Sequence, residues 1–234
     1  MNRMTRPAIP SHALLVRTHN PRRARSFTTG LAALDGLLPG GGFACGAVHE
    51  ILSAPSAGVP LVFAALLARS AINVVGGVIA WLDPRRETYP PALADLGVPL
   101  ERSYMLRGRK VADQVWSVVE CCRSEGVGAV VADLPKLSKV EARRLQLAAE
   151  RGGGIGLLLR PFGSAHYAAA TRWVVRPTRG SPESRQWEVE LVHGHGGRIG
   201  ERVVIEVCRE TNHVRAVEKL ADRQDQAKTI RASA

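Results

Sequence analysis

The amino-acid sequence predicts an α/β fold in which a mostly parallel sheet is flanked by helices and continues into an antiparallel C-terminal meander. Strand-like and helix-like segments alternate between residues 47 and 159, which is typical of parallel strands joined by crossover helices. After Arg172 the helical segments stop, and strand-like segments follow one another with turn residues between them. The chain has 234 residues, of which 45% are hydrophobic, enough for one sizeable core.

Each element rests on a local pattern. Short apolar runs predict strands at 47–52, 77–83, 103–108, 128–134 and 154–159. The segments between them predict helices at 58–75, 90–97, 110–125 and 138–151, and in the third of these Val111, Val115, Val118 and Cys122 recur at helical spacing. Strand-like segments at 173–177, 187–193 and 202–208 form the meander, with the glycine-rich stretch 194–197 as a hairpin signal.

We expect three regions along the chain. Residues 1–26 contain six arginines, three prolines and no acidic residue, which predicts a basic, poorly ordered arm. Residues 27–208 form the α/β domain. Residues 209–234 are polar and predict a tail that has room for one short helix at 214–223. The arm either contacts nucleic acid or a partner, or is a solvated tail.

The charge balance indicates an affinity for polyanions. The formal net charge is +11, a surplus that attracts DNA, RNA or acidic protein surfaces. The alternative is a composition that is rich in arginine throughout, so the charge does not by itself establish binding to nucleic acid. Basic candidates for such a contact are Arg22, Arg23, Arg25, Lys136, Lys139, Arg143 and Arg144, although residues of this kind on a helix are often only solvated.

Other features narrow the class of protein. The most apolar stretch, 59–75, is interrupted by Arg69 and Asn73, and no continuous signal core precedes it, so we expect a cytoplasmic protein without a membrane span. We expect the four cysteines to be reduced thiols, because the adjacent Cys121 and Cys122 cannot form a zinc-binding pair. His193 and His195 are expected to be turn residues, and no metal site is predicted.

The most specific segment is TTGLAALDGLLPGGGFACGAVHEIL, residues 28–52. It resembles the start of the RecA/RadA/KaiC ATPase core, in which a TG…LD…L-GGG…G segment leads into the first core strand. Glycines at 40–42 and at 46 permit tight turns there. The resemblance implies a RecA-like P-loop NTPase core.

The phosphate loop of such a core has the pattern GxxxxGK[ST], whose lysine neutralises phosphate and whose hydroxyl binds Mg²⁺. In residues 53–60 only Gly58 matches. Ser53 stands at the first glycine, Val59 at the lysine and Pro60 at the Ser/Thr. We therefore expect a vestigial loop and no functional cofactor, with weak ATP binding left open.

Two more positions point the same way. Asp133 ends an apolar run and resembles the Walker B aspartate, here vestigial because its Ser/Thr partner is missing. Arg85 occupies the place of the catalytic glutamate, and Glu87 lies nearby. Arg160 follows a strand where a γ-phosphate sensor is common, but we expect it to be a surface arginine. No catalytic residue and no ATP hydrolysis are predicted.

The order of motifs over residues 27–220 is similar to that of the ImuA family, which resembles both RecA and SulA. The similarity implies a non-catalytic adaptor in damage-induced mutagenesis, the SOS response and translesion synthesis. Its implied partners are an ImuB-like relative of Y-family polymerases and an error-prone DnaE-type polymerase, with RecA as a further candidate. Partner contacts are implied in 203–234, where the candidates Val214, Val217 and Leu220 either bind a partner or pack on the core.

Three other functions stay open. A SulA-like inhibitor of cell division that binds FtsZ shares the degenerate core but does not need the basic arm. An active RecA/RadA-like recombination ATPase requires the missing phosphate-loop residues. A stand-alone DNA-binding module requires salt-sensitive binding through the basic surface. The intervals 134–153 and 160–172, where RecA-type proteins carry DNA-gripping loops, are short here.

Overall fold

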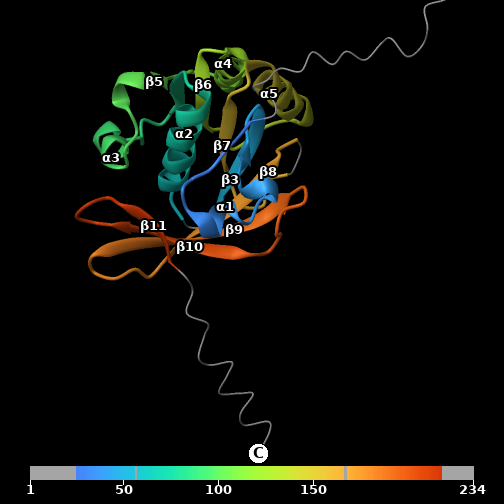
Figure 1. Cartoon of the computed structure of the whole chain (residues 1–234). Coiled ribbons are helices and arrows are strands. Elements are labelled where there is room, and N and C mark those ends of the chain that lie inside the picture. Colours follow the sequence, from blue (N-terminus) through green and yellow to red (C-terminus); the bar gives the residue numbers. More distant parts are fainter. Residues whose placement is uncertain (1–24, 56, 166–167, 218–234) are drawn as a thin grey trace, which may run out of the picture.

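The computed structural model describes residues 25–55, 57–165 and 168–217. Within this part of the chain nine strands form one sheet in the order β11-β10-β9-β8-β3-β7-β6-β4-β5, and a separate two-stranded sheet joins β1 and β2 (Figure 1). The strands are β1 (Ser26–Phe27), β2 (Phe43–Ala44), β3 (Ala47–Ser53), β4 (Val78–Leu82), β5 (Ser103–Leu106), β6 (Val127–Asp133), β7 (Ile155–Pro161), β8 (Thr171–Thr178), β9 (Ser184–Gly194), β10 (Arg202–Cys208) and β11 (Val214–Val217). The helices are α1 (Ala32–Asp35), α2 (Leu61–Val75), α3 (Pro90–Asp95), α4 (Val111–Arg123) and α5 (Lys139–Gly152), with single 3₁₀ turns at Pro39–Gly41 and Leu100–Arg102.

The parallel half of the sheet is covered on both faces. Alternate residues of β3, β4, β6 and β7 pack either against α2 or against α4 and α5, so their side chains divide between two apolar cores. Trp81 and Trp173 lie in the α2 core, and Leu145 of α5 lies in the other. Figure 1 shows α4 and α5 side by side, away from α2. The predicted parallel strands and crossover helices are confirmed.

The antiparallel half begins at β8, which pairs parallel with β3 and antiparallel with β9. One face of β9 and β10 adds Val189, Leu191, Val203 and Ile205 to the α2 core. The opposite face carries cross-strand ion pairs, among them Arg176 with Glu190 at 2.6 Å. The predicted C-terminal meander is confirmed, and the predicted turn connects β9 with β10.

The segment that leads into β3 is held by its own polar groups. Asp35 Oδ1 accepts hydrogen bonds from the Thr29 backbone N–H and hydroxyl, both at 2.8 Å, while Asp35 Oδ2 accepts one from the Gly30 N–H at 3.2 Å. Asp35 is buried, so these bonds also satisfy its carboxylate. Gly46 has a φ of 65°, which favours glycine immediately before β3. The TG…LD pattern is therefore a local clamp.

Two expectations need correction. Residues 214–217 are not helical: they form β11, which pairs antiparallel with β10. The hairpin forms because Asn212 takes a φ of 52° in the turn and Val214 and Ala216, on one face of the strand, pack against the α2 core. The α/β domain therefore extends beyond residue 208. Helix α2 begins at Leu61 rather than at residue 58, because Pro60 precedes it as N-cap. Most of the predicted arm and the rest of the predicted tail lie outside the described residues.

Candidate functional site

The residues predicted from the phosphate-loop pattern come together at the carboxyl ends of the parallel strands. A pocket of about 330 Å³ opens there. Its lining includes Ser53, Gly58, Val59, Pro60, Arg85, Glu87, Asp133, Pro135, Arg160 and Pro161. Pockets at this edge are the usual ligand sites of open α/β sheets. The fold thus brings the predicted residues together in one pocket, and the side chains that line the pocket determine which ligands it can bind.

The loop between β3 and α2 offers few polar groups to this pocket. Val59 is partly buried and packs against the α2 core. Pro60 is the N-cap of α2 and makes no side-chain cap. Gly58 has no positive φ, and a Cβ built on it meets nothing within 4 Å, so neither strain nor crowding requires glycine there. This loop joins a strand to a helix without a side-chain cation.

On the opposite wall of the pocket, Arg85 contacts the carboxylates of both Asp133 and Glu87. Its Nη2 donates a short hydrogen bond to Asp133 Oδ2, and its Nε lies 3.4 Å from Glu87 Oε1. Burial raises the pKa of Asp133, and the neighbouring Arg85 opposes that rise. Both carboxylates of this wall therefore face a guanidinium, whereas a Mg²⁺ site needs their oxygens free.

The loop that carries Arg85 is held by Asp83. The backbone N–H groups of Glu87 and Thr88 donate to Asp83 Oδ1 and Oδ2 at 3.0 and 2.8 Å. Although burial acts in the other direction, these hydrogen bonds keep the pKa of Asp83 below its usual value. Arg86 has a φ of 59°, an uncommon conformation for a residue with a Cβ. Asp83 therefore fixes the loop that places Arg85 over Asp133.

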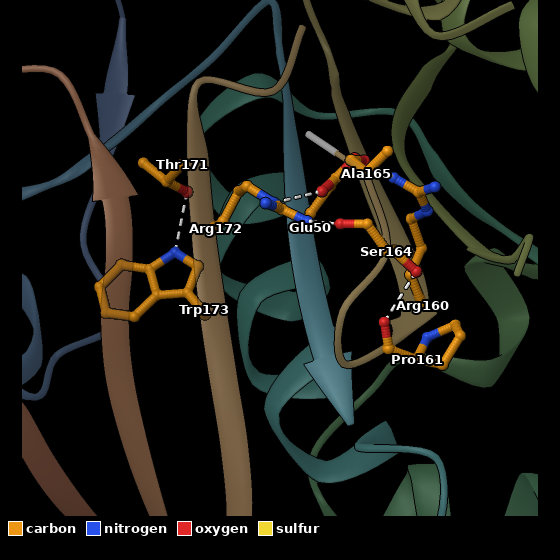
Figure 2. A network of polar contacts seen from close by, with 8 residues as sticks. All are labelled: Glu50, Arg160, Pro161, Ser164, Ala165, Thr171, Arg172 and Trp173. Atoms are coloured by element: carbon orange, nitrogen blue, oxygen red, sulfur yellow. Dashed lines mark hydrogen bonds and ion pairs between the residues drawn. The ribbon is translucent and has the colours of Figure 1, made fainter. Parts of the chain in front are cut away.

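Arg160 is not the surface arginine that we expected. Its side chain is 3% exposed, and its Nη1 donates to Glu50 Oε1 at 2.7 Å (Figure 2). Arg172 Nε donates to the other oxygen, Glu50 Oε2, at 2.6 Å. The prediction failed because β7 and β8 both pair with β3 in the sheet, which brings both arginines next to Glu50. We call Glu50, Arg160 and Arg172 the buried charge cluster.

The buried charge cluster also holds the loop that joins β7 to β8. Arg160 Nη1 donates to the Ala165 carbonyl at 2.9 Å, and Arg172 Nη2 donates to the Ser164 carbonyl at 2.6 Å (Figure 2). The Ser164 hydroxyl donates to the Pro161 carbonyl at 2.7 Å. Two arginines share one glutamate, and the buried Arg160 Nε has no hydrogen-bond partner in the described part of the chain. The cluster therefore orders the loop at an electrostatic cost.

A second buried polar chain runs on the other face of β3. Trp173 Nε1 donates to Thr171 Oγ1 at 2.8 Å, and this hydroxyl lies 2.8 Å from His49 Nδ1. His49 Nε2 lies 2.9 Å from the Ala44 carbonyl, so Nε2 carries the proton and Nδ1 accepts from Thr171. Burial lowers the pKa of His49 to about 4. Both nitrogens of the neutral His49 ring are hydrogen-bonded, and the bond to Ala44 connects β3 with β2.

The remaining predicted residues lie elsewhere. Lys136, Lys139, Arg143 and Arg144 are exposed in or just before α5, and Arg25 is exposed at the start of the described chain. Val214 packs against the α2 core and Val217 is half-buried in β11, while Arg22, Arg23 and Leu220 lie outside the described residues. The four cysteines are free thiols. Burial raises the pKa of Cys122 to about 12 and that of Cys45 to about 11, so neither is a thiolate near neutral pH.

The described residues contain neither a candidate metal-binding cluster nor a candidate membrane-spanning helix. They contain no group of three or more His, Cys, Asp or Glu side chains arranged to hold a metal ion. No helix among them has the length and apolar character that a membrane span requires.

The fold defines the chain as an α/β protein with a mostly parallel sheet and a pocket at the carboxyl ends of its strands. The described lining of this pocket contains no lysine, and its two carboxylates are paired with one arginine. The chain is 31% identical over 231 residues to protein ImuA of Caulobacter vibrioides, in strains NA1000 / CB15N and ATCC 19089, covering 88% of this chain and 93% of that protein. The chain belongs to the ImuA family.

A weaker similarity links part of the chain to another class. The cell division inhibitor SulA of Edwardsiella piscicida is 30% identical over 101 residues, which cover 43% of this chain and 60% of that protein. SulA of Photorhabdus laumondii is 28% identical over 83 residues, 36% of this chain and 47% of that protein. No protein-family model matches the chain.

Proposed function

We propose that the protein is a non-catalytic accessory protein of DNA-damage-induced mutagenesis. Its similarity to ImuA over 88% of the chain supports this role, as does the order of motifs in the sequence. In this proposal it acts as an adaptor with an ImuB-like relative of Y-family polymerases and an error-prone DnaE-type polymerase during translesion synthesis in the cytoplasm, with RecA as a further candidate partner.

The observation that carries the non-catalytic part is the pairing of Arg85 with Asp133. We propose that the sheet is a RecA-like core and that residues 53–60 are its degenerate phosphate loop. Val59 then replaces the lysine, Pro60 replaces the Mg²⁺-binding hydroxyl, and Arg85 replaces the glutamate that activates water. A guanidinium cannot act as a general base, because it stays protonated at any physiological pH. Three separate requirements of ATP hydrolysis are then missing.

The pocket suggests how such a core serves as an adaptor. In RecA-like ATPases this edge of the sheet holds nucleotide between subunits. Without nucleotide the same edge is free to bind a protein, and its lining of Pro60, Pro135 and Pro161 beside the half-buried Val59 suits an apolar contact. The adaptor role therefore needs no cofactor.

Three measurements test this proposal. A deletion strain should lose damage-induced mutation and regain it with the wild-type chain, and affinity purification after DNA damage should recover a polymerase component. Purified protein should show no Mg²⁺-dependent ATP turnover. An unchanged mutation frequency after deletion would contradict the biological role, whereas turnover would contradict the non-catalytic one.

A second function is favoured by the SulA similarity. A SulA-like inhibitor that binds FtsZ would cause cells to filament when overproduced, with no loss of induced mutation on deletion. The similarity to SulA covers 43% of this chain, whereas the similarity to ImuA covers 88%, so the mutagenesis role has the stronger support. Microscopy of overproducing cells, together with the mutation frequency of the deletion strain, separates the two functions.

A further inference from the structure

Helix α5 has exposed apolar residues in addition to the apolar face that packs on the sheet. Its inner face buries Ala142, Leu145, Ala148 and Ala149. On the opposite side Val140 is 69% exposed and Leu147 is 46% exposed. These two residues are seven apart, which places them on one stripe of the helix two turns from each other. Neither side chain belongs to the buried face by which α5 packs on the sheet.

Basic side chains surround this stripe. Arg143 and Arg144 fall between Val140 and Leu147 at spacings of three and four residues, and Lys136 and Lys139 stand at the start of the helix. All four are exposed. We call Lys136, Lys139, Val140, Arg143, Arg144 and Leu147 the α5 outer face.

The positive charges of the α5 outer face are only partly offset by the described part of the chain, in which the charge of Arg144 acts on Glu141. None of its four basic side chains forms an ion pair with a described residue. Glu141, the acidic residue closest in sequence, instead receives hydrogen bonds from the Ser138 N–H and hydroxyl at 2.8 and 2.7 Å in a capping box. The face therefore presents excess positive charge around an apolar centre.

We propose that the α5 outer face docks an acidic amphipathic helix of a partner protein. Carboxylates of that helix would pair with the four basic residues, and its apolar residues would cover Val140 and Leu147. Phosphates of a nucleic acid would use the same charges but gain nothing from the two apolar residues, so the face favours protein. The helical part of the face, from Lys139 to Leu147, spans about 12 Å at about 1.5 Å per residue, so two to three turns of a partner helix match it. The inference rests on the proposed adaptor function and adds the chemistry of the partner segment.

The test is site-specific photocrosslinking in cells after DNA damage, with the full-length chain carrying a photoreactive phenylalanine in place of Leu147. We expect a light-dependent protein adduct whose crosslinked peptide is net acidic and has apolar residues three or four positions apart. A control chain carries the photoreactive residue at Ile199, which is 60% exposed in the loop between β9 and β10, and should not give this adduct. No protein adduct at position 147, an adduct with nucleic acid, or a segment without acidic character overturns the proposal.

Matched charge reversals sharpen the test. In the photoreactive chain, Arg143→Glu with Arg144→Glu should lower the adduct yield by about tenfold, because two attractions become repulsions. Arg198→Glu with Arg209→Glu makes the same change in net charge on exposed loops elsewhere and should leave the yield within about twofold. Equal losses in both variants overturn the proposal. The induced mutation frequency of the same strains is scored separately: a strain that still mutates but gives no adduct refutes the docking face alone, and a deletion without a mutation phenotype refutes the proposed function.

Discussion

Two arginine–carboxylate sites of the parallel half of the sheet pair the same chemical groups but differ in position and in exposure to solvent. In the first, Arg85 contacts Asp133 and Glu87 with its side chain 54% exposed. In the second, Arg160 and Arg172 share Glu50, whose side chain is 2% exposed. The first site touches the pocket wall and joins β6 to a loop. The second fixes the carbonyls of the loop between β7 and β8.

The difference shows where charge stabilises this fold and where it does not. An ion pair in solvent contributes little, because water and salt screen it and long side chains lose freedom. A buried carboxylate between two arginines is different, since removing it leaves uncompensated charge in the interior. The buried charge cluster thus has a structural role, while Arg85 mainly changes what the pocket can bind.

The largest effect is expected from Glu50→Ala. It leaves the buried Arg160 and the partly buried Arg172 without their carboxylate, and the free energy of unfolding should fall by about 3–5 kcal/mol. Urea unfolding followed by circular dichroism measures this change. The matched control is Glu87→Ala, which removes the exposed carboxylate of the other site and should change stability by less than about 1 kcal/mol. Equal losses in the two variants would remove the contrast between the sites.

His49, next to Glu50 in β3, predicts a dependence on pH. Its pKa is about 4 in the folded chain against 6.5 for an ordinary histidine, so the unfolded chain takes up a proton first as pH falls. Stability from this group is present above pH 6.5 and is lost as pH falls toward 4, at up to about 1.4 kcal/mol per pH unit. Urea unfolding of the wild type and of His49→Gln between pH 7 and 4 isolates this slope. Parallel curves for the two proteins would show that His49 does not contribute it.

The sequence predicted the parallel half of the sheet well for a physical reason. Strands buried on both faces are continuous apolar runs, and the crossover helices between them have clear periodicity. Ser53, Val59, Arg85 and Asp133 were selected by the resemblance to a phosphate loop and its partner positions, and in the structure they line one pocket at the carboxyl ends of the parallel strands.

What the sequence did not predict depends on which strands are neighbours. Glu50, Arg160 and Arg172 are charged residues of three different strands, and only the order β8-β3-β7 brings them together. The available signal was one charge inside the apolar run 47–52 and one arginine next to each of the runs 154–159 and 173–177, and these runs do not specify which strands are neighbours. β11 was mistaken for a helix because Val214 and Val217 are compatible with helical spacing, whereas Val214 and Ala216 alternate as in a strand.

Supplying the residues that the proposed degenerate phosphate loop lacks tests whether the exposed Arg85 site prevents ATP turnover. Val59→Lys with Pro60→Thr adds a lysine and a hydroxyl, while Arg85 still contacts Asp133. We expect no Mg²⁺-dependent ATP turnover, and a loss of about 1 kcal/mol in stability because Val59 packs on the core. The control adds Arg85→Glu, which removes the guanidinium. ATP turnover in the Val59→Lys/Pro60→Thr variant, which keeps Arg85, would show that Arg85 does not block the site.

The smallest effect on stability is expected from Arg85→Ala. Its side chain is more than half exposed, so losing the contacts to Asp133 and Glu87 should change the free energy of unfolding by less than about 1 kcal/mol. The informative readout is the pKa of Asp133. Burial already raises it and Arg85 opposes that rise, so removing Arg85 should raise the pKa further. Titration of the Asp133 carboxyl by NMR measures the shift, and Arg85→Lys, which keeps the positive charge, should reverse most of it. A pKa of Asp133 that does not move on removal of Arg85 would mean that the guanidinium does not control this carboxylate in solution, and the electrostatic contrast between the two sites would then rest on the buried charge cluster alone.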